Sequence, residues 1–333
     1  MRAYVMSRYG GPEVAGLTDV PMPKVGPGQL LVRVRAAGLN PVDFKIREGK
    51  LRIIQRYRLP AVMGNELAGE VEAVGDDVTR FAPGDRVFAR VPKEAMGAFA
   101  EYAVLPEDVV ARMPDDVDFA MAAAVPLAGL TALQALRDEL HLGPDSRVFI
   151  PGGAGGVGTF AIQIAKWLGA HVATTASQRG RGLVERLGAD QVIGYTTERF
   201  QDHLHDVDGV FDLIGAETLV DSFAVVKPGG TVVSVAALPE PQTALKDLGR
   251  GRRLAALFWL ISFPLRKAAR RHGVRYRFLF MHPSGTELAE LAGLIQDGKL
   301  TPIIDKVYPF DRIADAFTHL ESGRAKGKIV VTM

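Results

Sequence analysis

The stretch Arg147-Val-Phe-Ile-Pro-Gly-Gly-Ala-Gly-Gly-Val-Gly158 predicts the fold of the middle of the chain. A short apolar strand enters a glycine-rich turn, and the residues that follow have the apolar spacing of a helix. Gly153, Gly155 and Gly158 have the spacing of the dinucleotide fingerprint. In that pattern the first glycine permits the tight turn, the second admits a pyrophosphate, and the third lets helix and strand pack closely. With a second strand at 171–175, the order predicts a dinucleotide site.

The start of this helix is expected to hold phosphate groups. Unpaired N–H groups and the positive end of the helix dipole favour anions there. The predicted cofactor contacts in this turn are Gly153, Ala154, Gly155, Gly156 and Val157.

The residues after the second strand indicate which dinucleotide binds. An NAD site places a carboxylate there for the ribose hydroxyls. This chain reads Thr175-Ala-Ser-Gln-Arg-Gly-Arg181, with no acid before Glu185. A hydroxyl and guanidinium groups bind a 2′-phosphate through charge-assisted hydrogen bonds. We therefore predict NADPH as the cofactor, with Ser177, Arg179 and Arg181 as phosphate ligands; the alternative is a basic surface turn that merely starts the next helix.

Composition limits the class of protein. The 333 residues are 47% hydrophobic and 23% charged, which suits a soluble protein of two domains. The chain has no cysteine, so it has no disulfides, thiolate nucleophiles or cysteine-based zinc and iron–sulfur sites. Its longest apolar run, 254–265, is interrupted by Ser262 and Pro264 and is too short to span a bilayer. No signal-peptide core follows Met1, so a cytoplasmic location is expected.

The pattern of apolar and polar residues changes along the chain. Up to about residue 124, short alternating runs between glycine and proline turns predict strands. The middle of the chain alternates strands with helices, which predicts a parallel sheet with right-handed crossovers. Its expected strands are 148–150, 172–175, 191–193, 210–213, 231–235 and 276–279, with a turn at 227–230 before the fifth.

One segment, 246–277, departs from the rest in charge. It contains ten Lys/Arg residues and one acid around an apolar centre, a net charge of +9 in a chain of +2. One interpretation is a helix that packs its apolar face on the core and leaves a charged face in water. The others are the roof of a pocket or a dimer contact, and a weak contact with a membrane surface. Nucleic acid is disfavoured because aromatic residues do not alternate with the basic ones.

Several motifs along the chain match one family pattern. They are Ala37-Gly-Leu-Asn-Pro-Val-Asp43, Gly64-Asn-Glu-Leu-Ala-Gly-Glu-Val71, Pro83-Gly-Asp-Arg-Val-Phe88, Ala124-Val-Pro-Leu-Ala-Gly-Leu-Thr-Ala132, Gly152–Gly158, Leu187-Gly-Ala-Asp190 and Gly323-Arg-Ala-Lys-Gly-Lys-Ile-Val330. Over essentially its whole length the chain resembles the zinc-independent medium-chain dehydrogenases/reductases of the quinone oxidoreductase branch. The resemblance implies an α/β protein and a homodimer. A GroES-like β-rich catalytic domain would comprise 1–124 and 281–333, and a Rossmann domain with a doubly wound parallel sheet would comprise 125–280.

The zinc ligands of related alcohol dehydrogenases are missing. Asn40 stands where those enzymes have a Cys, Asn65 stands where they have a His, and the lobe with four cysteines is absent between Phe88 and Tyr102. Zinc lowers the pKa of a bound alcohol, so oxidation of simple alcohols loses its main support. We therefore predict no metal, and hydride transfer from NADPH to a quinone. The alternatives are reduction of the double bond of an α,β-unsaturated carbonyl, and an NADPH-binding sensor or recruited protein without catalysis.

The resemblance also supplies candidate catalytic residues. Asn40 and Thr131 would border the nicotinamide, and Asn40 has donors for an acceptor oxygen. Lys45 would act as an electrophile or contact the cofactor, with a solvated helix residue as the alternative. Proton supply for a double-bond reductase would rest on Lys45 or water.

The remaining candidates have structural alternatives. Tyr195 would lie near the 2′-phosphate, although from the sequence alone it is equally a core aromatic. Asp43 and Glu66 are expected to hold loop geometry rather than transfer protons. For Lys328, near the C-terminus, a surface position is favoured over a contact with the cofactor.

Overall fold

The computed structural model describes residues 1–333 and divides into two units, Met1–Leu130 with His282–Met333, and Thr131–Met281. The first boundary falls after residue 130, whereas the sequence predicted it after residue 124. The difference arises at Pro126, because this proline begins helix α3 (Pro126–Leu133), which continues across the boundary. The first turn of a helix tolerates proline, since the N–H it lacks would have no helical partner there.

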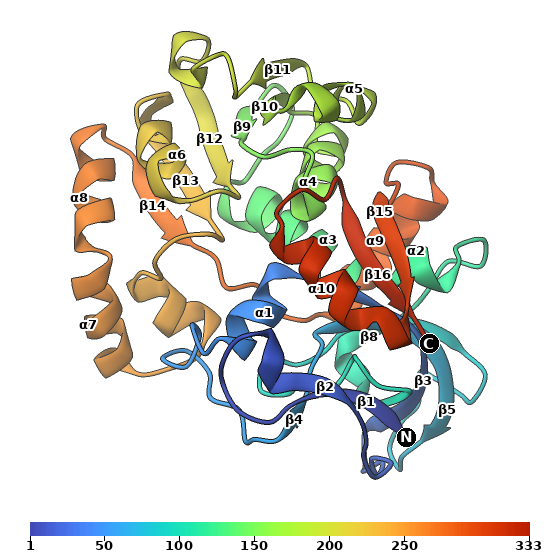
Figure 1. Ribbon diagram of the computed structural model, residues 1–333. Helices are drawn as coiled ribbons and strands as arrows, with labels where there is room; N and C mark the ends of the chain where they lie inside the picture. Colours follow the sequence, from blue (N-terminus) through green and yellow to red (C-terminus); the bar gives the residue numbers. More distant parts are fainter. The chain divides into compact units, whose positions relative to one another are not determined.

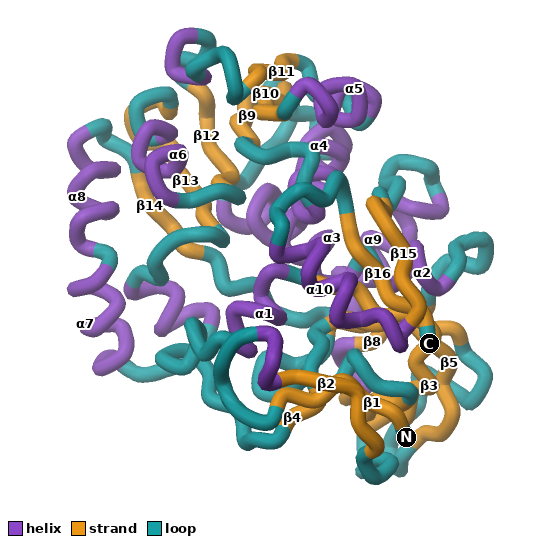
Figure 2. The backbone as a smooth tube through the Cα atoms, viewed as in Figure 1, coloured by secondary structure: helices purple, strands orange, loops and turns teal.

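The Thr131–Met281 unit contains a six-stranded parallel sheet (Figures 1 and 2). Its order is β11-β10-β9-β12-β13-β14, so the chain fills one half of the sheet and then the other. This is the strand order of a doubly wound dinucleotide-binding fold, as predicted. The strands are β9 (Arg147–Ile150), β10 (His171–Ala176), β11 (Gln191–Gly194), β12 (Val207–Asp212), β13 (Val226–Ser234) and β14 (Arg275–Phe278).

The predicted turn at 227–230 lies inside β13. Val226 pairs with Val207, and the next pair along the two strands is Thr231 with Gly209, so the intervening residues form an irregularity in the ladder. Gly229 has φ +85°, which glycine adopts without a Cβ clash.

Helices connect the strands of this unit. They are α4 (Gly156–Trp167), α5 (Gln178–Arg186), α6 (Ala216–Ser222), α7 (Arg252–Ile261) and α8 (Phe263–Arg271), with π-helical segments at Gln134–Glu139 and Thr243–Asp247. A buried apolar cluster packs under the sheet, with Phe149 and Phe200 at a ring separation of 4.8 Å.

The other unit is mainly β. A seven-stranded sheet follows the order β15-β16-β3-β5-β6-β8, with β7 paired to β3, and a second sheet has the order β2-β1-β4. The strands are β1 (Arg2–Met6), β2 (Ala15–Asp19), β3 (Gln29–Leu39), β4 (Ala61–Val62), β5 (Glu66–Val74), β6 (Arg86–Arg90), β7 (Tyr102–Pro106), β8 (Val110–Arg112), β15 (Ile304–Pro309) and β16 (Lys328–Thr332). Strand β16 pairs antiparallel with β3, so segments far apart in the sequence lie side by side in one sheet.

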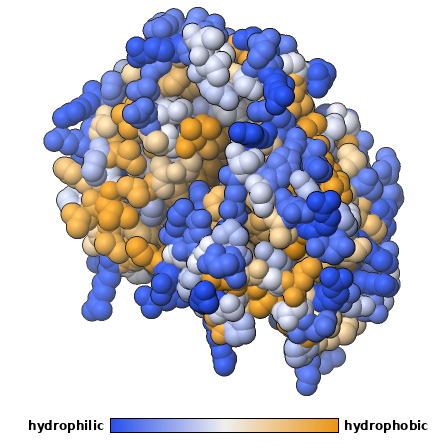
Figure 3. Space-filling view, in the orientation of Figure 1, coloured by the Kyte–Doolittle hydropathy of each residue, from blue (hydrophilic) through white to orange (hydrophobic).

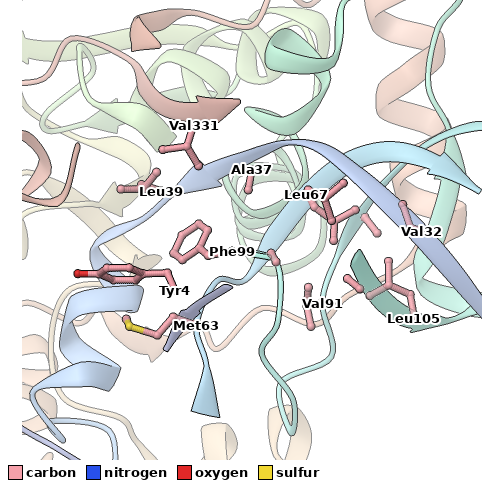
Figure 4. Packing of buried hydrophobic residues seen from close by; sticks show 14 of the residues in the cluster. Tyr4, Val32, Ala37, Leu39, Met63, Leu67, Val91, Phe99, Leu105 and Val331 are labelled. Carbon is pink, nitrogen blue, oxygen red and sulfur yellow. The ribbon is translucent and has the colours of Figure 1, made fainter. Parts of the chain in front are cut away.

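The short helices of this unit are α1 (Pro41–Arg47), α2 (Phe119–Ala123), α9 (Gly285–Gln296) and α10 (Ile313–Glu321). Phe317 of α10 packs on Tyr4 and Phe99, with ring separations of 5.6 and 5.8 Å. Figure 4 shows Tyr4 and Phe99 among Leu39, Met63 and neighbouring apolar side chains. In neither unit does a helix have the length and apolar character needed to cross a membrane.

Candidate functional site

The turn between β9 and α4, residues 151–155, is here named the glycine turn. Gly152 has φ +81°, and Gly155 is the N-cap of α4. The positive φ falls at Gly152, one residue before the first glycine of the fingerprint, Gly153. Gly155 and Gly158 keep their predicted places, at the N-cap and in the first turn of the helix.

Gly153 and Gly158 are required for close packing. A Cβ on Gly153 would stand 2.2 Å from Oγ1 of Thr174, and one on Gly158 would stand 2.5 Å from the carbonyl oxygen of Gly152. Both positions therefore exclude any side chain. A Cβ on Gly155 would meet nothing closer than 3.4 Å, so its lack of a side chain leaves space beside the helix start rather than relieving a contact in the protein.

Two threonines of β10 hold the glycine turn. The N–H of Gly152 donates to Oγ1 of Thr175 at 2.9 Å, and the N–H of Gly153 donates to Oγ1 of Thr174 at 3.1 Å. The Thr174 hydroxyl in turn donates to the carbonyl oxygen of Ile150 at 2.6 Å. The turn is thus fixed by its neighbouring strand, which holds the start of α4 and its unpaired N–H groups in place.

The glycine turn suits a pyrophosphate. Gly155, Gly156 and Val157 are partly exposed, whereas Gly153 and Ala154 are buried beneath them. The first N–H groups of α4 have no partner in the helix, because a helix leaves its first four donors unpaired. A glycine cradle with open donors at a helix N-terminus fits the phosphates of a dinucleotide.

The predicted 2′-phosphate ligands lie at the end of the neighbouring strand. Ser177 is the N-cap of α5, and its hydroxyl makes no capping hydrogen bond. Arg179 is exposed and has no ion pair. Arg181 is held loosely, 3.6 Å from Glu185 and 4.0 Å from Glu198. A hydroxyl and a guanidinium are therefore open to a phosphate, and Arg181 must exchange two weak pairs to join them.

Tyr195 directly follows β11 and is 58% exposed, so the alternative of a core aromatic is wrong. The register pairs Ala176 with Gly194, which places Ser177 and Tyr195 at the same edge of the sheet. The structure thus brings this tyrosine to the same strand ends as the predicted phosphate ligands.

A buried group in the other unit, here named the lysine cluster, joins Lys328, Glu66 and Asn40. Lys328 begins β16, Glu66 begins β5, and Asn40 follows β3. The Lys328 ammonium donates to Oε1 of Glu66 at 2.7 Å and to Oδ1 of Asn40 at 2.5 Å. Lys328 is 3% exposed and Glu66 0%. The expected surface position of Lys328 is therefore wrong, because the side chain points into the interior of the unit, where the buried carboxylate of Glu66 meets it.

The amide of Asn40 is used at both ends. Its Nδ2 donates to Oε1 of Glu66 at 2.7 Å and lies 3.4 Å from the Gly38 carbonyl oxygen, while its Oδ1 accepts from Lys328. The second Glu66 oxygen accepts from the N–H of Leu127 at 2.6 Å. In this arrangement Asn40 orients the cluster and has no spare donor for an acceptor oxygen.

Asp43 lies beside the lysine cluster at the start of α1. It accepts from the N–H of Asn40 at 2.7 Å and from Nδ2 of Asn65 at 2.6 Å. Burial raises the pKa of Asp43 to about 7, against the effect of these two hydrogen bonds. Arg90, also buried, donates to the Asn65 carbonyl oxygen at 3.2 Å. These contacts fit the predicted role of Asp43 and Glu66 in holding loop geometry.

The other two catalytic candidates differ in exposure. Lys45 in α1 is half-buried, and burial lowers the pKa of its ammonium, which makes it a stronger acid. Thr131 lies in α3 and is buried, with 4% of its surface exposed. Their catalytic roles stay predictions.

The lysine cluster does not suit a divalent cation. Asn40 and Asn65 offer amides in place of thiolate and imidazole, and the ammonium of Lys328 already neutralises Glu66. No group of three or more His, Cys, Asp or Glu side chains comes together anywhere in the chain in a way that could hold a metal. The residues therefore do not fit the zinc of alcohol dehydrogenases.

Sequence reasoning missed several residues. Thr174 and Thr175 were read only as strand, although hydroxyls at the end of a strand beside a glycine turn are a usable signal. Asn65 and Arg90 had no local signal, since their contacts are with residues far away in sequence. Lys328 starts an apolar strand, and only the pairing of β16 with β3 shows where it points.

A glycine cradle on a doubly wound sheet, together with a β-rich unit lacking zinc ligands, defines a dinucleotide-dependent, zinc-independent oxidoreductase. Residues 26–115 match the alcohol dehydrogenase GroES-like domain, and residues 187–331 match the zinc-binding dehydrogenase family.

Named relatives agree with this class. The chain is 35% identical to the mitochondrial NAD(P)H oxidoreductase RTN4IP1 of Danio rerio, covering 100% of this chain and 91% of that protein. It is 36% identical to the chloroplastic NADPH-dependent alkenal/one oxidoreductase of Arabidopsis thaliana, covering 99% and 79%. The quinone oxidoreductase structure from Coxiella burnetii superposes with a TM-score of 0.86 at 32% identity, covering 100% and 99%. The chain belongs to the zinc-independent quinone oxidoreductase branch of the medium-chain dehydrogenases/reductases.

Proposed function

We propose that this chain transfers hydride from NADPH to a quinone. The observation that carries the proposal is the lysine cluster, in which Lys328 and Asn40 engage Glu66 where zinc dehydrogenases build a Lewis-acid site. Without that polarising centre, the acceptor must already be electrophilic. A quinone meets this requirement because conjugation carries the incoming charge onto its oxygens. The similar structure from Coxiella burnetii is that of a quinone oxidoreductase, which supports this substrate class.

The cofactor contacts follow from the two strand ends. Gly153, Ala154, Gly155, Gly156 and Val157 would cradle the pyrophosphate, with Ser177, Arg179 and Arg181 on the 2′-phosphate and Tyr195 beside them. When bound, NADPH supplies the hydride, that is, both electrons of the reduction. The acceptor takes up one further proton to give the hydroquinone, so the protein must orient the reactants, exclude water and deliver that proton.

A second candidate is reduction of the carbon–carbon double bond of an enone. This reaction needs a proton at the α-carbon after hydride reaches the β-carbon. Lys45 favours it, because its half-buried ammonium has a lowered pKa and no hydrogen bond within the protein. Asn40 is occupied in the lysine cluster, which leaves Lys45 as the better candidate for the acceptor oxygen or the proton. The Arabidopsis relative carries an alkenal/one name.

The test is oxidation of NADPH and NADH by 1,4-benzoquinone, 9,10-phenanthrenequinone, acrolein and 3-buten-2-one, with analysis of the products. We expect quinone turnover with NADPH preferred. Saturated carbonyl products instead of quinone turnover would select the second candidate. NADPH binding without turnover of any acceptor would refute both and leave the sensor or recruited protein. A homodimer and a cytoplasmic location are retained as predictions, to be checked by light scattering and fractionation.

A further inference from the structure

Helices α7 and α8 follow one another with only Ser262 between them. Ser262 itself keeps a helical conformation, and its hydroxyl donates to the Phe258 carbonyl oxygen at 2.6 Å. The inner face of this pair is packed on the unit, since Phe258, Ala255 and Ala269 are 0%, 8% and 1% exposed. These buried residues satisfy the core contact that an amphipathic helix needs.

The outer face of α7 is apolar as well. Leu257, Trp259, Leu260 and Phe263 are 41%, 50%, 64% and 44% exposed. At 100° per residue they lie on one side of the helix, away from Phe258. The rings of Trp259 and Phe263 are 5.9 Å apart. Figure 3 shows apolar side chains gathered at the left of the view, over α7, with hydrophilic ones beyond them.

This face is unlike the surface of an ordinary solvated helix. A surface helix normally presents polar residues opposite its buried stripe, and a helix that is apolar all round is covered by something. Large contiguous apolar patches on a protein surface mark contacts with partners or membranes. The interpretation of 246–277 as a helix with a solvated charged face therefore fails for α7.

The basic residues of the segment fall into two groups. Lys246 pairs with Glu139 at 2.7 Å, and Arg277 pairs with Glu139, Glu240 and Asp247 at 3.0, 3.2 and 2.5 Å, so these two charges have acidic partners within the unit.

The second group surrounds the apolar face. The exposed side chains without an acidic partner are Arg252, Arg253, Lys267, Arg270, Arg271 and Arg275. Arg266 lies over the Trp259 ring, 5.2 Å from its centre. No Asp or Glu occurs from residue 248 to residue 286. The apolar face is thus flanked at both ends by uncompensated positive charge.

We propose that α7 and α8 dock on an anionic lipid surface, with Leu257, Trp259, Leu260 and Phe263 entering the headgroup region. Aromatic and leucine side chains with flanking Lys/Arg are the composition of helices that lie in a membrane interface. Anionic lipid attracts each nearby basic residue by about 1 kcal/mol. A second copy of the chain on this face would bring two unpaired basic clusters together, so charge favours lipid. The proposal stands independently of the reductase activity.

The test uses the full chain with vesicles of phosphatidylcholine alone and of phosphatidylcholine mixed with phosphatidylglycerol, at low and high salt. We expect cosedimentation with the anionic vesicles only, weakened by salt, and a blue shift of tryptophan fluorescence. The double variant Trp259→Ser/Leu260→Ser should lose at least about tenfold in vesicle affinity, because two exposed apolar side chains no longer leave water. Arg270→Gln/Arg271→Gln should lose about tenfold and show a shallower salt dependence.

Matched controls lie on the other unit. Met22→Ser/Val307→Ser removes two apolar side chains that are 48% and 44% exposed, and should bind vesicles like the parent. Arg8→Gln/Lys24→Gln removes two exposed positive charges and should also bind vesicles like the parent. The thermal unfolding midpoint of every variant should match that of the parent. The proposal is overturned by equal binding to both vesicle types, by no binding, or by loss of a dimer instead of vesicle affinity in Trp259→Ser/Leu260→Ser.

Discussion

The glycine turn is made by residues that follow one another in the chain, whereas the lysine cluster joins side chains from positions 40, 66 and 328. In the turn, the N–H groups of Gly152 and Gly153 donate to Thr175 and Thr174, so β10 fixes the backbone that leads into α4. In the cluster, side chains from three strand ends satisfy one another's charge inside a β unit. A site made of local backbone can be read from spacing, but a site made of distant side chains depends on strand register.

The largest expected effect is on the cluster. Lys328→Met leaves the Glu66 carboxylate buried without its cation, which should lower the free energy of unfolding by about 3–5 kcal/mol. Urea unfolding monitored by circular dichroism measures this loss. The double variant Glu66→Gln/Lys328→Met should recover part of it, because no buried charge is left unpaired. Lys326→Met is the matched control and should change stability by less than about 0.5 kcal/mol. If Lys328→Met and Lys326→Met lowered the free energy of unfolding equally, the pairing of Lys328 with Glu66 would have no special role in stability.

Substitutions at the predicted 2′-phosphate ligands should change the affinity for NADPH rather than the stability of the fold. Ser177→Asp/Arg179→Ala removes a hydroxyl and a free guanidinium and adds a repelling carboxylate, so NADPH binding should weaken by about 1.5–3 kcal/mol. Titration calorimetry with NADPH and NADH gives the comparison, and NADH should change far less. Arg181→Ala should cost less than Arg179→Ala, because Arg181 must first leave Glu185 and Glu198. Arg186→Ala on the same helix is the control. Equal losses of affinity for NADPH and NADH would show that these residues do not bind the 2′-phosphate.

Substitution of two glycines of the turn should distinguish an effect on packing from an effect on NADPH binding. Gly153→Ala places a Cβ against Thr174, so unfolding should become easier by about 1–3 kcal/mol. Gly155→Ala meets no such contact in the protein, so its stability should fall by less than about 1 kcal/mol. Its NADPH affinity should still fall about tenfold, since the methyl group occupies space reserved for the pyrophosphate. Thermal unfolding with and without NADPH tests both, and a stable Gly153→Ala would contradict the packing argument.

A further expected effect is a pH dependence centred on Asp43. Its folded pKa of about 7 lies above the ordinary value of 3.8, so the folded protein holds this proton more tightly than the unfolded chain. Stability from this group is therefore complete below pH 3.8 and is lost as the pH rises towards 7. Asp190 and Asp208 have lowered pKa values and act in the opposite sense at lower pH.

Urea midpoints measured across this range test the Asp43 effect. Asp43→Asn should flatten the fall in stability above pH 3.8, and the exposed control Asp108→Asn should retain it. A fall of the same size in Asp43→Asn would assign the effect to another group.

Much of the Thr131–Met281 unit could be predicted from the sequence, because each parallel strand is a short apolar run followed by a turn. The six strands lie near the predicted ranges, and the glycine turn has its expected place between strand and helix. The positive φ of Gly152 could not be predicted, since three of four consecutive positions there are glycine and spacing alone does not show which one takes it.

The β-rich unit was harder to read. Its motifs located Asn40, Asp43 and Glu66, but the partner of each depends on how β3, β5 and β16 align. Lys328 shows the reason, because a lysine at the start of a strand points into the interior of the unit or into water according to a register that one residue can shift.

The position of Lys328 also affects the order in which this protein can be completed during synthesis. Asn40 and Glu66 leave the ribosome well before the cation that neutralises Glu66, which lies 262 residues further along the chain. Until β16 pairs with β3, the nascent β unit carries a carboxylate that has no charged partner and must remain hydrated. Strand β16 therefore closes a unit whose other strands were made much earlier, and the intervening nucleotide-binding unit is synthesised while that unit waits.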